Sequence, residues 1–369
     1  MLFGMGHTGV LISYLCTSMV SNNRLLKRRL LVRGHCDSFS GYGQLFCGLV
    51  RGLKDYGFDL VVRPTCVDER YGPLGDDIKS LLWQNEPAIQ RELLVHLPRG
   101  SFPNKKAVLW FTMWESARLK PTWVEFLNDS KAVIVPNAWN ASTFSASGVD
   151  SPIHKVPLFI DRNIYGYKEM RKSGTFIFGC GGRTVYGGCR KGLDRLVKLF
   201  KRAFPDERGV QLWIKTLPDC EIDDPKDSRV RIWKDYLTDS MMADWYSKLH
   251  CFVSVSSGEG WGFMQHQAMS VGRPLISARY SGVSEFFDGE SSGFPLEYTF
   301  EQATDIYKEH GIWGVPTDES VIRSMRIAYG NLDLCESKGW NASKRVSEFT
   351  IENTINKLVP LIEKYEISR

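Results

Sequence analysis

Two short segments rich in glycine and basic residues begin the second half of the chain. The first, Gly-Cys-Gly-Gly-Arg, ends with Gly182 and Arg183, and the second, Gly-Gly-Cys-Arg-Lys-Gly, holds Arg190 and Lys191 directly before a helical pattern. Glycine lets an anion approach the backbone closely, a helix start offers free N–H groups, and the basic side chains add full positive charge. The pattern predicts a cradle for a phosphate or diphosphate; a surface turn with solvated basic side chains is the alternative. Its glycine spacing is neither that of a P-loop nor that of a dinucleotide site, so neither an ATPase nor a dehydrogenase is indicated.

A carboxylate and an amide follow in a later loop and helix. Glu259 lies in a glycine-rich loop after an apolar strand pattern, and Gln267 lies eight residues further on, about one turn inside the next helical pattern. Both side chains can therefore face one cleft, where they suit the hydroxyl groups of a ligand. A third loop ends at Glu285, for which ordinary helix capping is the expected role.

The N-terminal half offers fewer chemical groups. Tyr42 lies between Gly41 and Gly43, just after the first strand pattern. Trp114 and Glu115 follow a strand at residues 108–111, and Asn137 follows the next one. Glu115 is a candidate ligand or base for an acceptor hydroxyl, whereas Trp114 either stacks on a ring or packs in the core. Asn137 is also a suitable helix cap.

The elements that must position these side chains alternate between strands and helices. Apolar runs predict strands at residues 29–35, 58–62, 108–111, 132–135 and near 156, and again at 175–179, 210–215, near 230, 251–255 and 274–277. Helical spacing is found at residues 45–56, 123–127, after 137, and at 191–204, 241–249 and 263–271. We therefore predict an α/β fold of two doubly wound halves, with a cleft between the carboxyl ends of their parallel sheets.

Changes in composition suggest where the domains begin and end. Residues 161–174 combine Gly, Tyr and alternating charge and are the expected linker between an N-terminal domain at 30–160 and a C-terminal domain at 175–345. Apolar residues at 351, 355, 358, 359, 362 and 365 predict a helix within residues 346–369. Residues 1–29 form a leader, and poor order is the simplest expectation for it.

Composition excludes some classes of protein. With 369 residues, 43% of them hydrophobic and 24% charged, the chain can bury a sizeable core, so general disorder is excluded. Its net charge of +5 is too small to indicate a nucleic-acid binder by itself. The aromatic content of 12% suits sugar or base ligands. The nine cysteines form no Cys-x-x-Cys pair, which favours reduced thiols in an intracellular protein.

The first 29 residues bear on localisation. An apolar run at residues 10–20 is too short to span a bilayer, and its basic residues follow the run instead of preceding it. We expect no cleaved signal and no transmembrane helix, and hence a cytoplasmic protein. A weak peripheral contact with an anionic membrane through residues 27–29 stays open.

Taken together, the motifs of the second half resemble the donor domain of retaining GT-B glycosyltransferases, family 4-like, also called glycosyl transferases group 1. They are Gly-Gly-Arg at 181–183 with Lys-Gly at 191–192, Glu-Gly-Trp-Gly-Phe at 259–263, Gln-Ala-Met-Ser-Val-Gly-Arg-Pro-Leu-Ile at 267–276, and Ser-Gly-Val-Ser-Glu at 281–285. The resemblance implies two Rossmann-like domains facing across a cleft, with the C-terminal helix packing back on the N-terminal domain. It also implies a hexosyltransferase-type enzyme of class EC 2.4, which moves a sugar with retention from a UDP- or GDP-sugar co-substrate to an acceptor hydroxyl.

The resemblance also assigns roles to residues. Arg183 and Lys191 would neutralise the diphosphate, Glu259 would contact the transferred sugar, and Gln267 stands where the family has a glutamate for the ribose hydroxyls. The expected donor-binding residues are Gly41, Gly43, Gly182, Arg183, Lys191, Glu259, Gly260, Trp261, Gly262, Phe263 and Gln267. Arg183, Lys191, Glu259 and Glu115 are the expected catalytic residues, and Tyr42, Trp114, Glu115 and Asn137 are expected on the acceptor side. Because the chain has no Asp-x-Asp tripeptide, we expect a metal-independent reaction without a cofactor.

The acceptor and two rival functions stay open. A glycan or another biopolymer is the expected acceptor, and lipid-linked saccharide, protein and hydroxymethylated DNA bases all fit one cleft. A DNA acceptor would favour a basic rim made of Lys27, Arg28, Arg29, Lys105, Lys106 and Arg118, whereas scattered solvated charge is the simpler interpretation. A glycoside hydrolase could use Glu115 and Glu259 but would not need the neighbouring cations. Gln267 makes a non-catalytic nucleotide-sugar or glycan-binding protein conceivable, and no obligate protein partner is indicated.

Overall fold

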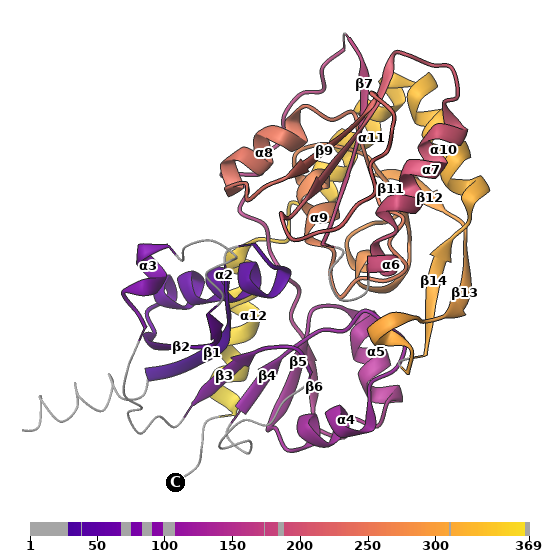
Figure 1. Cartoon of the computed structure of the whole chain (residues 1–369). Helices are drawn as coiled ribbons and strands as arrows, with labels where there is room; N and C mark the ends of the chain where they lie inside the picture. Colours follow the sequence, from indigo (N-terminus) through magenta and orange to yellow (C-terminus); the bar gives the residue numbers. More distant parts are fainter. Residues whose placement is uncertain are drawn as a thin grey trace, which may run out of the picture.

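The computed structural model describes residues 29–37, 39–67, 75–82, 91–98, 108–172, 174–183, 188–309 and 311–365. Within these ranges the chain folds into two α/β domains, one above the other in Figure 1. Each domain is built on a six-stranded sheet. Every strand pair in both sheets is parallel, as expected for doubly wound halves.

The N-terminal sheet has the strand order β2-β1-β3-β4-β5-β6. Its strands are β1 (Arg29–Cys36), β2 (Asp59–Val67), β3 (Glu92–Val95), β4 (Val108–Phe111), β5 (Ala132–Val135) and β6 (Ile153–Lys155), and its helices are α2 (Gly41–Tyr56), α3 (Asp76–Lys79), α4 (Pro121–Asn128) and α5 (Ala138–Ala146). The Ser40 side chain accepts the Gly43 N–H at the start of α2, and Gly57 ends the helix in a left-handed conformation. These local signals explain why the sequence predicts this helix well.

The C-terminal sheet has the order β12-β11-β10-β7-β8-β9. Its strands are β7 (Phe176–Gly181), β8 (Val210–Thr216), β9 (Val230–Lys234), β10 (Cys251–Val253), β11 (Leu275–Ala278) and β12 (Gly293–Leu296). The helices are α6 (Gly188–Lys191), α7 (Leu193–Ala203), α8 (Asp239–Ser247), α9 (Phe263–Ser270), α10 (Asp318–Gly330) and α11 (Leu332–Arg345), with a 3₁₀ turn at Ser281–Glu285. The sequence predicts most of these elements to within a few residues.

A hairpin of β13 (Tyr298–Gln302) and β14 (Ile312–Pro316) extends from the C-terminal domain to the N-terminal domain. The sequence does not predict it. In Figure 1 it extends from the upper domain down beside the lower one. Residues of the hairpin and of the turn that connects its strands, including Tyr307 and Trp313, are buried in one apolar cluster with Trp114. The hairpin therefore packs against the N-terminal domain.

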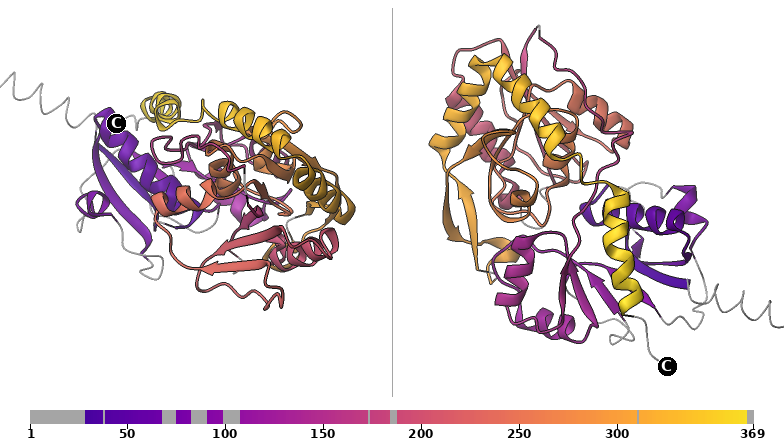
Figure 2. Two further views of the ribbon diagram at one scale, coloured as in Figure 1. Left: turned by 90° about the horizontal axis from the view of Figure 1, so that it is seen from above. Right: turned by 180° about the vertical axis from the view of Figure 1, so that it is seen from behind.

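The C-terminal helix α12 (Ile351–Lys364) returns to the N-terminal domain, as Figure 2 shows in the view from behind. It packs on α2, where a Cβ added at Gly52 would lie 2.7 Å from Cγ1 of Ile355. Its buried residues include Ile355, Leu358 and Val359. The expected return of this helix is confirmed.

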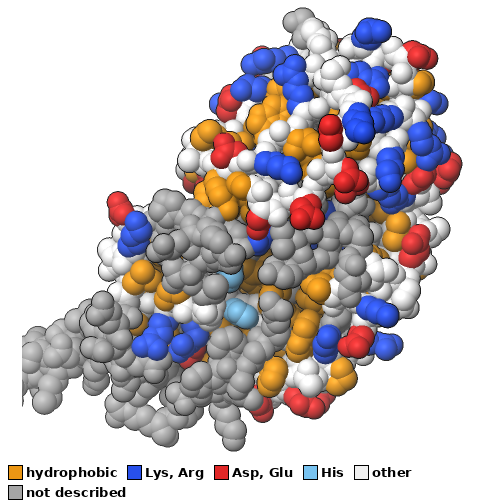
Figure 3. All heavy atoms as spheres, in the orientation of Figure 1, with side chains coloured by type: hydrophobic (Ala, Val, Ile, Leu, Met, Phe, Trp, Pro, Cys, Tyr) orange, Lys and Arg blue, Asp and Glu red, His pale blue; other side chains and the backbone are white. Residues whose placement is uncertain are grey.

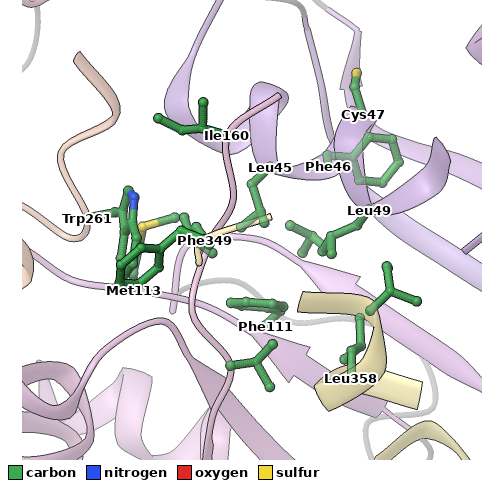
Figure 4. Close-up of a cluster of buried hydrophobic side chains, with 14 of the residues drawn as sticks. Leu45, Phe46, Cys47, Leu49, Phe111, Met113, Ile160, Trp261, Phe349 and Leu358 are labelled. Carbon is green, nitrogen blue, oxygen red and sulfur yellow. The ribbon is translucent and has the colours of Figure 1, made fainter. Parts of the chain in front are cut away.

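One apolar cluster runs through both domains. Figure 4 shows Leu45, Leu49, Phe111 and Leu358 of the N-terminal side, together with Trp261 from the C-terminal domain. The expected GT-B-like arrangement of two Rossmann-like domains is thus confirmed. Segment 161–174 holds neither strand nor helix among its described residues, whereas the leader, apart from Arg29, lies outside the described residues. None of the helices in the described part of the chain is long and apolar enough to cross a bilayer.

Candidate functional site

The loops that follow the strands of the two sheets touch each other. A Cβ on Gly258 would lie 2.2 Å from the backbone oxygen of Glu115, and one on Gly260 would lie 2.7 Å from Cγ of Met113. The neighbour of Gly258 is backbone, so close approach requires glycine there, whereas at Gly260 the Met113 side chain would have to shift. The Glu259 loop of the C-terminal domain is therefore seated directly on the end of β4.

A cluster of opposite charges lies at this contact. Lys191 Nζ is 2.6 Å from Oε1 of Glu259, and Arg190 Nη1 is 3.2 Å from Oε2 of the same carboxylate. On its other side, Arg190 Nη2 is 4.0 Å from Oε1 of Glu115. The Tyr307 hydroxyl donates to Oε2 of Glu115 at 3.3 Å, and its ring lies under the Arg190 guanidinium at 5.6 Å. Two cations and two carboxylates from both domains thus form one network.

Burial and neighbouring charge shift the protonation of this network. Burial opposes ionisation of Glu259, but Lys191 and Arg190 outweigh it and lower the pKa of that carboxyl to about 2. Burial raises the pKa of Glu115, because Arg190 only partly compensates for the lost water. Burial also lowers the pKa of Lys191, against the attraction of Glu259. Glu259 is therefore the carboxylate that stays ionised to lower pH, and Glu115 is the one that takes up a proton more easily.

Arg183 lies two residues after the end of β7 and contacts a different carboxylate from Lys191. Its Nη2 lies 2.6 Å from Oδ2 of Asp219, a residue of the long connection between β8 and β9. A Cβ on Gly182 would lie 3.0 Å from Cδ of Lys191, so the Lys191 side chain passes over the backbone directly before Arg183. The structure thus brings Lys191 and Glu259 into direct contact, while Arg183 lies at the edge of the group.

Gln267 faces the N-terminal domain from α9. Its Oε1 accepts the Tyr246 hydroxyl at 3.1 Å, and its Nε2 donates to Oε1 of Gln44 at 3.2 Å. The side chain is buried between α8, α9 and α2. A diol bound here would have to replace Gln44 as the acceptor of the Gln267 amide.

Two expected contact residues, Trp261 and Trp114, have side chains that pack in the core. Trp261 is 1% exposed, and its indole N–H donates to Nδ1 of His266. Trp114 packs on Trp123 and Tyr307, which corresponds to the core-packing alternative. A ligand contact by Trp261 would have to use its backbone.

Asn137 and Tyr42 are engaged through their polar atoms. Asn137 accepts the Asn140 N–H as the cap of α5, and it donates to the backbone oxygen of Gly260 at 2.6 Å. The Tyr42 hydroxyl lies 2.9 Å from both the backbone nitrogen and the backbone oxygen of Met113. These contacts make both residues part of the support for the charged network rather than open contact groups.

The remaining expected residues are backbone positions at helix starts. Gly41 and Gly43 open α2, where Gly43 is pressed against the backbone of Asp37. Gly262 precedes α9 with φ 101°, and the Phe263 ring lies 3.5 Å from a Cβ added at Gly41. Phe263 and Gly41 therefore meet across the two domains.

Several features of the site differ from the sequence expectation. The helix that starts at Gly188 is a single turn before α7 begins at Leu193, so its dipole contributes little to anion binding. Glu285 does not cap its own turn; its carboxylate accepts the Ala138 N–H at the start of α5 and pairs with Lys155 at 2.7 Å. The position of Arg190 between two carboxylates and the contact from Tyr307 had no signal in the sequence.

A cavity of about 950 Å³ lies beside this network, between the start of α7 and the β13–β14 hairpin. Its lining includes five carboxylates and several apolar side chains. The carboxylates are Asp194, Asp219, Glu221, Asp223 and Glu301. Among the residues that the structure describes, no group of three or more His, Cys, Asp or Glu side chains is arranged to hold a metal ion.

Comparison with known proteins agrees with this geometry. The sequence model of the family described as "Glycosyl transferases group 1" matches residues 175–305. No curated protein sequence matches the chain significantly. Among solved structures, S. aureus TarM, crystallised with Fondaparinux, alpha-GlcNAc-glycerol and UDP, is 17% identical with a TM-score of 0.57, over 73% of this chain and 55% of its own. The chain thus spans about half the length of TarM.

Two further structures match almost along their whole length. Sucrose-phosphate synthase from Thermosynechococcus elongatus is 13% identical with a TM-score of 0.66, over 91% of this chain and 98% of its own. Anabaena HepE, solved with UDP and glucose, is 12% identical with a TM-score of 0.64, over 91% of this chain and 100% of its own. At such identities the likeness shows the shared fold, and the family match adds the donor-side motifs. Residues 175–305 therefore match the glycosyl transferases group 1, and the chain shares its two-domain fold with solved glycosyltransferases.

Proposed function

We propose that this protein transfers a sugar from a nucleotide-diphosphate sugar to an acceptor hydroxyl, with retention and without a metal ion. The observation that carries the proposal is the network at the domain contact, in which Lys191 and Arg190 meet Glu259 and face Glu115 of the other domain. A hydrolase would have no use for two buried cations beside its carboxylates. The family match at residues 175–305 supports a nucleotide sugar as the donor.

The arrangement suits the charge that develops during transfer. Breaking the bond between sugar and phosphate places negative charge on the diphosphate and positive character on the anomeric carbon. Lys191 and Arg183 supply fixed positive charge for the leaving group. Glu259, held ionised by its neighbours, supplies a nearby negative charge for the sugar side.

Glu115 is the group proposed to meet the acceptor. It comes from the N-terminal domain, its side chain is largely buried, and burial raises its pKa. A carboxyl of that kind accepts a hydrogen bond from a hydroxyl and orients it for attack. In a retaining transfer the acceptor attacks the face from which the diphosphate leaves, and a phosphate oxygen takes the proton. We propose that Glu115 positions the acceptor hydroxyl in this step.

We propose UDP-sugars as the first donors to test, because TarM and HepE were both solved with UDP, and GDP-sugars as the second. We propose a glycan or another biopolymer as the acceptor. On the face of the C-terminal domain that Figure 3 shows, basic and acidic side chains are mixed. That face gives no electrostatic reason to favour DNA over an uncharged glycan, while Lys27, Arg28, Lys105 and Lys106 of the expected basic rim lie outside the described residues.

The test is the release of free UDP or GDP from nucleotide sugars without an acceptor, because an enzyme of this kind slowly transfers the sugar to water. Arg183→Ala should abolish release and weaken nucleotide binding while the protein stays folded. Arg202→Ala is the matched control, since Arg202 also pairs with an aspartate, Asp318, at 2.7 Å but lies on the outer surface. Equal rates in both variants would remove the diphosphate assignment.

A non-catalytic nucleotide-sugar-binding protein is the second candidate. The hydrogen bonds of Gln267 to Gln44 and Tyr246 favour it, because they occupy the amide that should meet the ribose. Such a protein would show saturable binding of nucleotide sugars without release of the nucleotide in any acceptor screen. The release assay therefore separates the two candidates directly.

A further inference from the structure

Each basic side chain of the expected diphosphate cradle contacts a carboxylate of the chain itself. Lys191 and Arg190 contact Glu259, and Arg183 contacts Asp219 at 2.6 Å. A donor diphosphate brings its own negative charges to these cations. Donor binding is therefore an exchange, in which phosphate oxygens must replace or join carboxylates that are already in place.

The carboxylates of Glu259 and Asp219 differ in how easily they can separate from their basic partners. The Glu259 side chain is 8% exposed, and the Gln265 amide donates to it at 3.3 Å in addition to the two cations. Removing it would leave buried positive charge without compensation. The Asp219 side chain is 38% exposed and its partner Arg183 is 27% exposed, so water can solvate both when they separate.

The chain around Asp219 also permits movement. It lies between β8, which ends at Thr216, and β9, which begins at Val230, in a connection without helix or strand. In the cavity, Glu221 and Asp223 lie on the same connection.

We propose that Asp219 occupies the position of a donor phosphate group on Arg183 and is displaced when the donor binds. The inference rests on the proposed function, because it takes Arg183 to be a diphosphate ligand. Asp219 then acts as an internal competitor that lowers nucleotide affinity. The ligands that displace it are those with a diphosphate, whereas a nucleoside without phosphate leaves the ion pair intact.

The experiment measures binding of UDP and uridine to the full-length protein by calorimetry, with GDP and guanosine as the second pair. Asp219→Asn should tighten binding of the diphosphate about two- to fivefold, the range expected for a partly exposed ion pair, and leave nucleoside binding unchanged. Asp223→Asn is the control, because Asp223 lines the same cavity on the same connection but has no ion pair with Arg183 among the described contacts. In an Arg183→Ala background, Asp219→Asn should have no effect.

Each outcome decides the inference. Unchanged diphosphate binding in Asp219→Asn would overturn the proposed competition. Weaker binding would also overturn it, because Asp219 would then hold Arg183 in its productive position. Equal tightening in Asp223→Asn would also overturn it, since the effect would then come from general charge in the cavity. If the wild-type protein bound neither UDP nor GDP, the proposed function would fail first, and the two failures are therefore distinguishable.

Discussion

Replacing Glu259 with glutamine removes the carboxylate that pairs with both Lys191 and Arg190. In Glu259→Gln the shape of the side chain is kept, while Lys191 and Arg190 lose the negative charge that lies 2.6 and 3.2 Å away. Removing one partner of a buried ion pair costs about 3–5 kcal/mol. The lower end applies, because the amide oxygen still accepts a hydrogen bond and Arg190 keeps its contact with the backbone oxygen of Gly258.

The pKa of Glu259 leads to the same magnitude. It falls from its ordinary value of 4.5 to about 2 in the folded protein. A carboxyl with a lowered pKa stabilises the fold above its unfolded pKa, and this contribution, about 3 kcal/mol, is lost as the pH falls from 4.5 to 2. The unfolding entropy is about 2.1 cal/mol/K per residue. For 369 residues, a loss of about 3 kcal/mol in the free energy of unfolding therefore lowers Tm by about 4 °C.

Thermal unfolding at pH 7, with and without UDP, is the assay. Glu259→Gln should unfold about 4 °C below wild type, and UDP should raise its Tm more than that of wild type, because the diphosphate returns negative charge to Lys191. Glu297→Gln is the control, since Glu297 pairs with Arg323 at 2.6 Å on the exposed surface. A Tm equal to wild type in Glu259→Gln, or an equal UDP shift in both proteins, would refute the reasoning.

Four further predictions concern the same site. Lys191→Ala should abolish transfer while the far-ultraviolet circular dichroism stays that of the wild type; retained rates would contradict its role. Gln267→Glu should keep or tighten nucleotide binding in a titration, because Tyr246 can still donate to it and Gln44 can rotate its amide; complete loss would show that the amide is required. Glu115→Gln should lower the transfer rate without lowering Tm. Burial raises the pKa of Glu115, so its ionisation lowers the free energy of unfolding of the wild type as the pH rises above 4.5, whereas the amide has no such cost. Chelator should leave activity unchanged, and strong inhibition by it would overturn the metal-free mechanism.

The sequence predicts the strands and their loops because their causes are local. Apolar runs that begin after polar or basic residues define β1, β4, β5 and β7, and Gly57 ends α2 in a left-handed conformation. Strand β3 was missed although it is as long as β4 and β5, because its three apolar residues lie between the polar residues Glu92 and His96. The β13–β14 hairpin was missed as well, because its strands are joined by a long connection without a tight-turn signature.

The site was predictable in its residue types but not in its pairing. Arg190 and Lys191 stand out in the sequence as cations, yet the contact from Lys191 to Glu259 joins residues 68 positions apart. Tyr307 reaches Glu115 across 192 positions, from a hairpin that the sequence does not reveal. Such pairings depend on how the two domains meet, which no local pattern encodes. Trp114 shows the converse, since an aromatic residue at a strand end fits both a sugar contact and the core that it occupies.

A structure of the protein with UDP bound tests the central claim most directly. We predict phosphate oxygens within hydrogen-bond distance of Arg183 and Lys191, with the Asp219 carboxylate turned away from Arg183. A UDP molecule ordered elsewhere, for example in the cavity beneath the hairpin, with both cations still on their carboxylates, would contradict the assignment of these residues to the diphosphate.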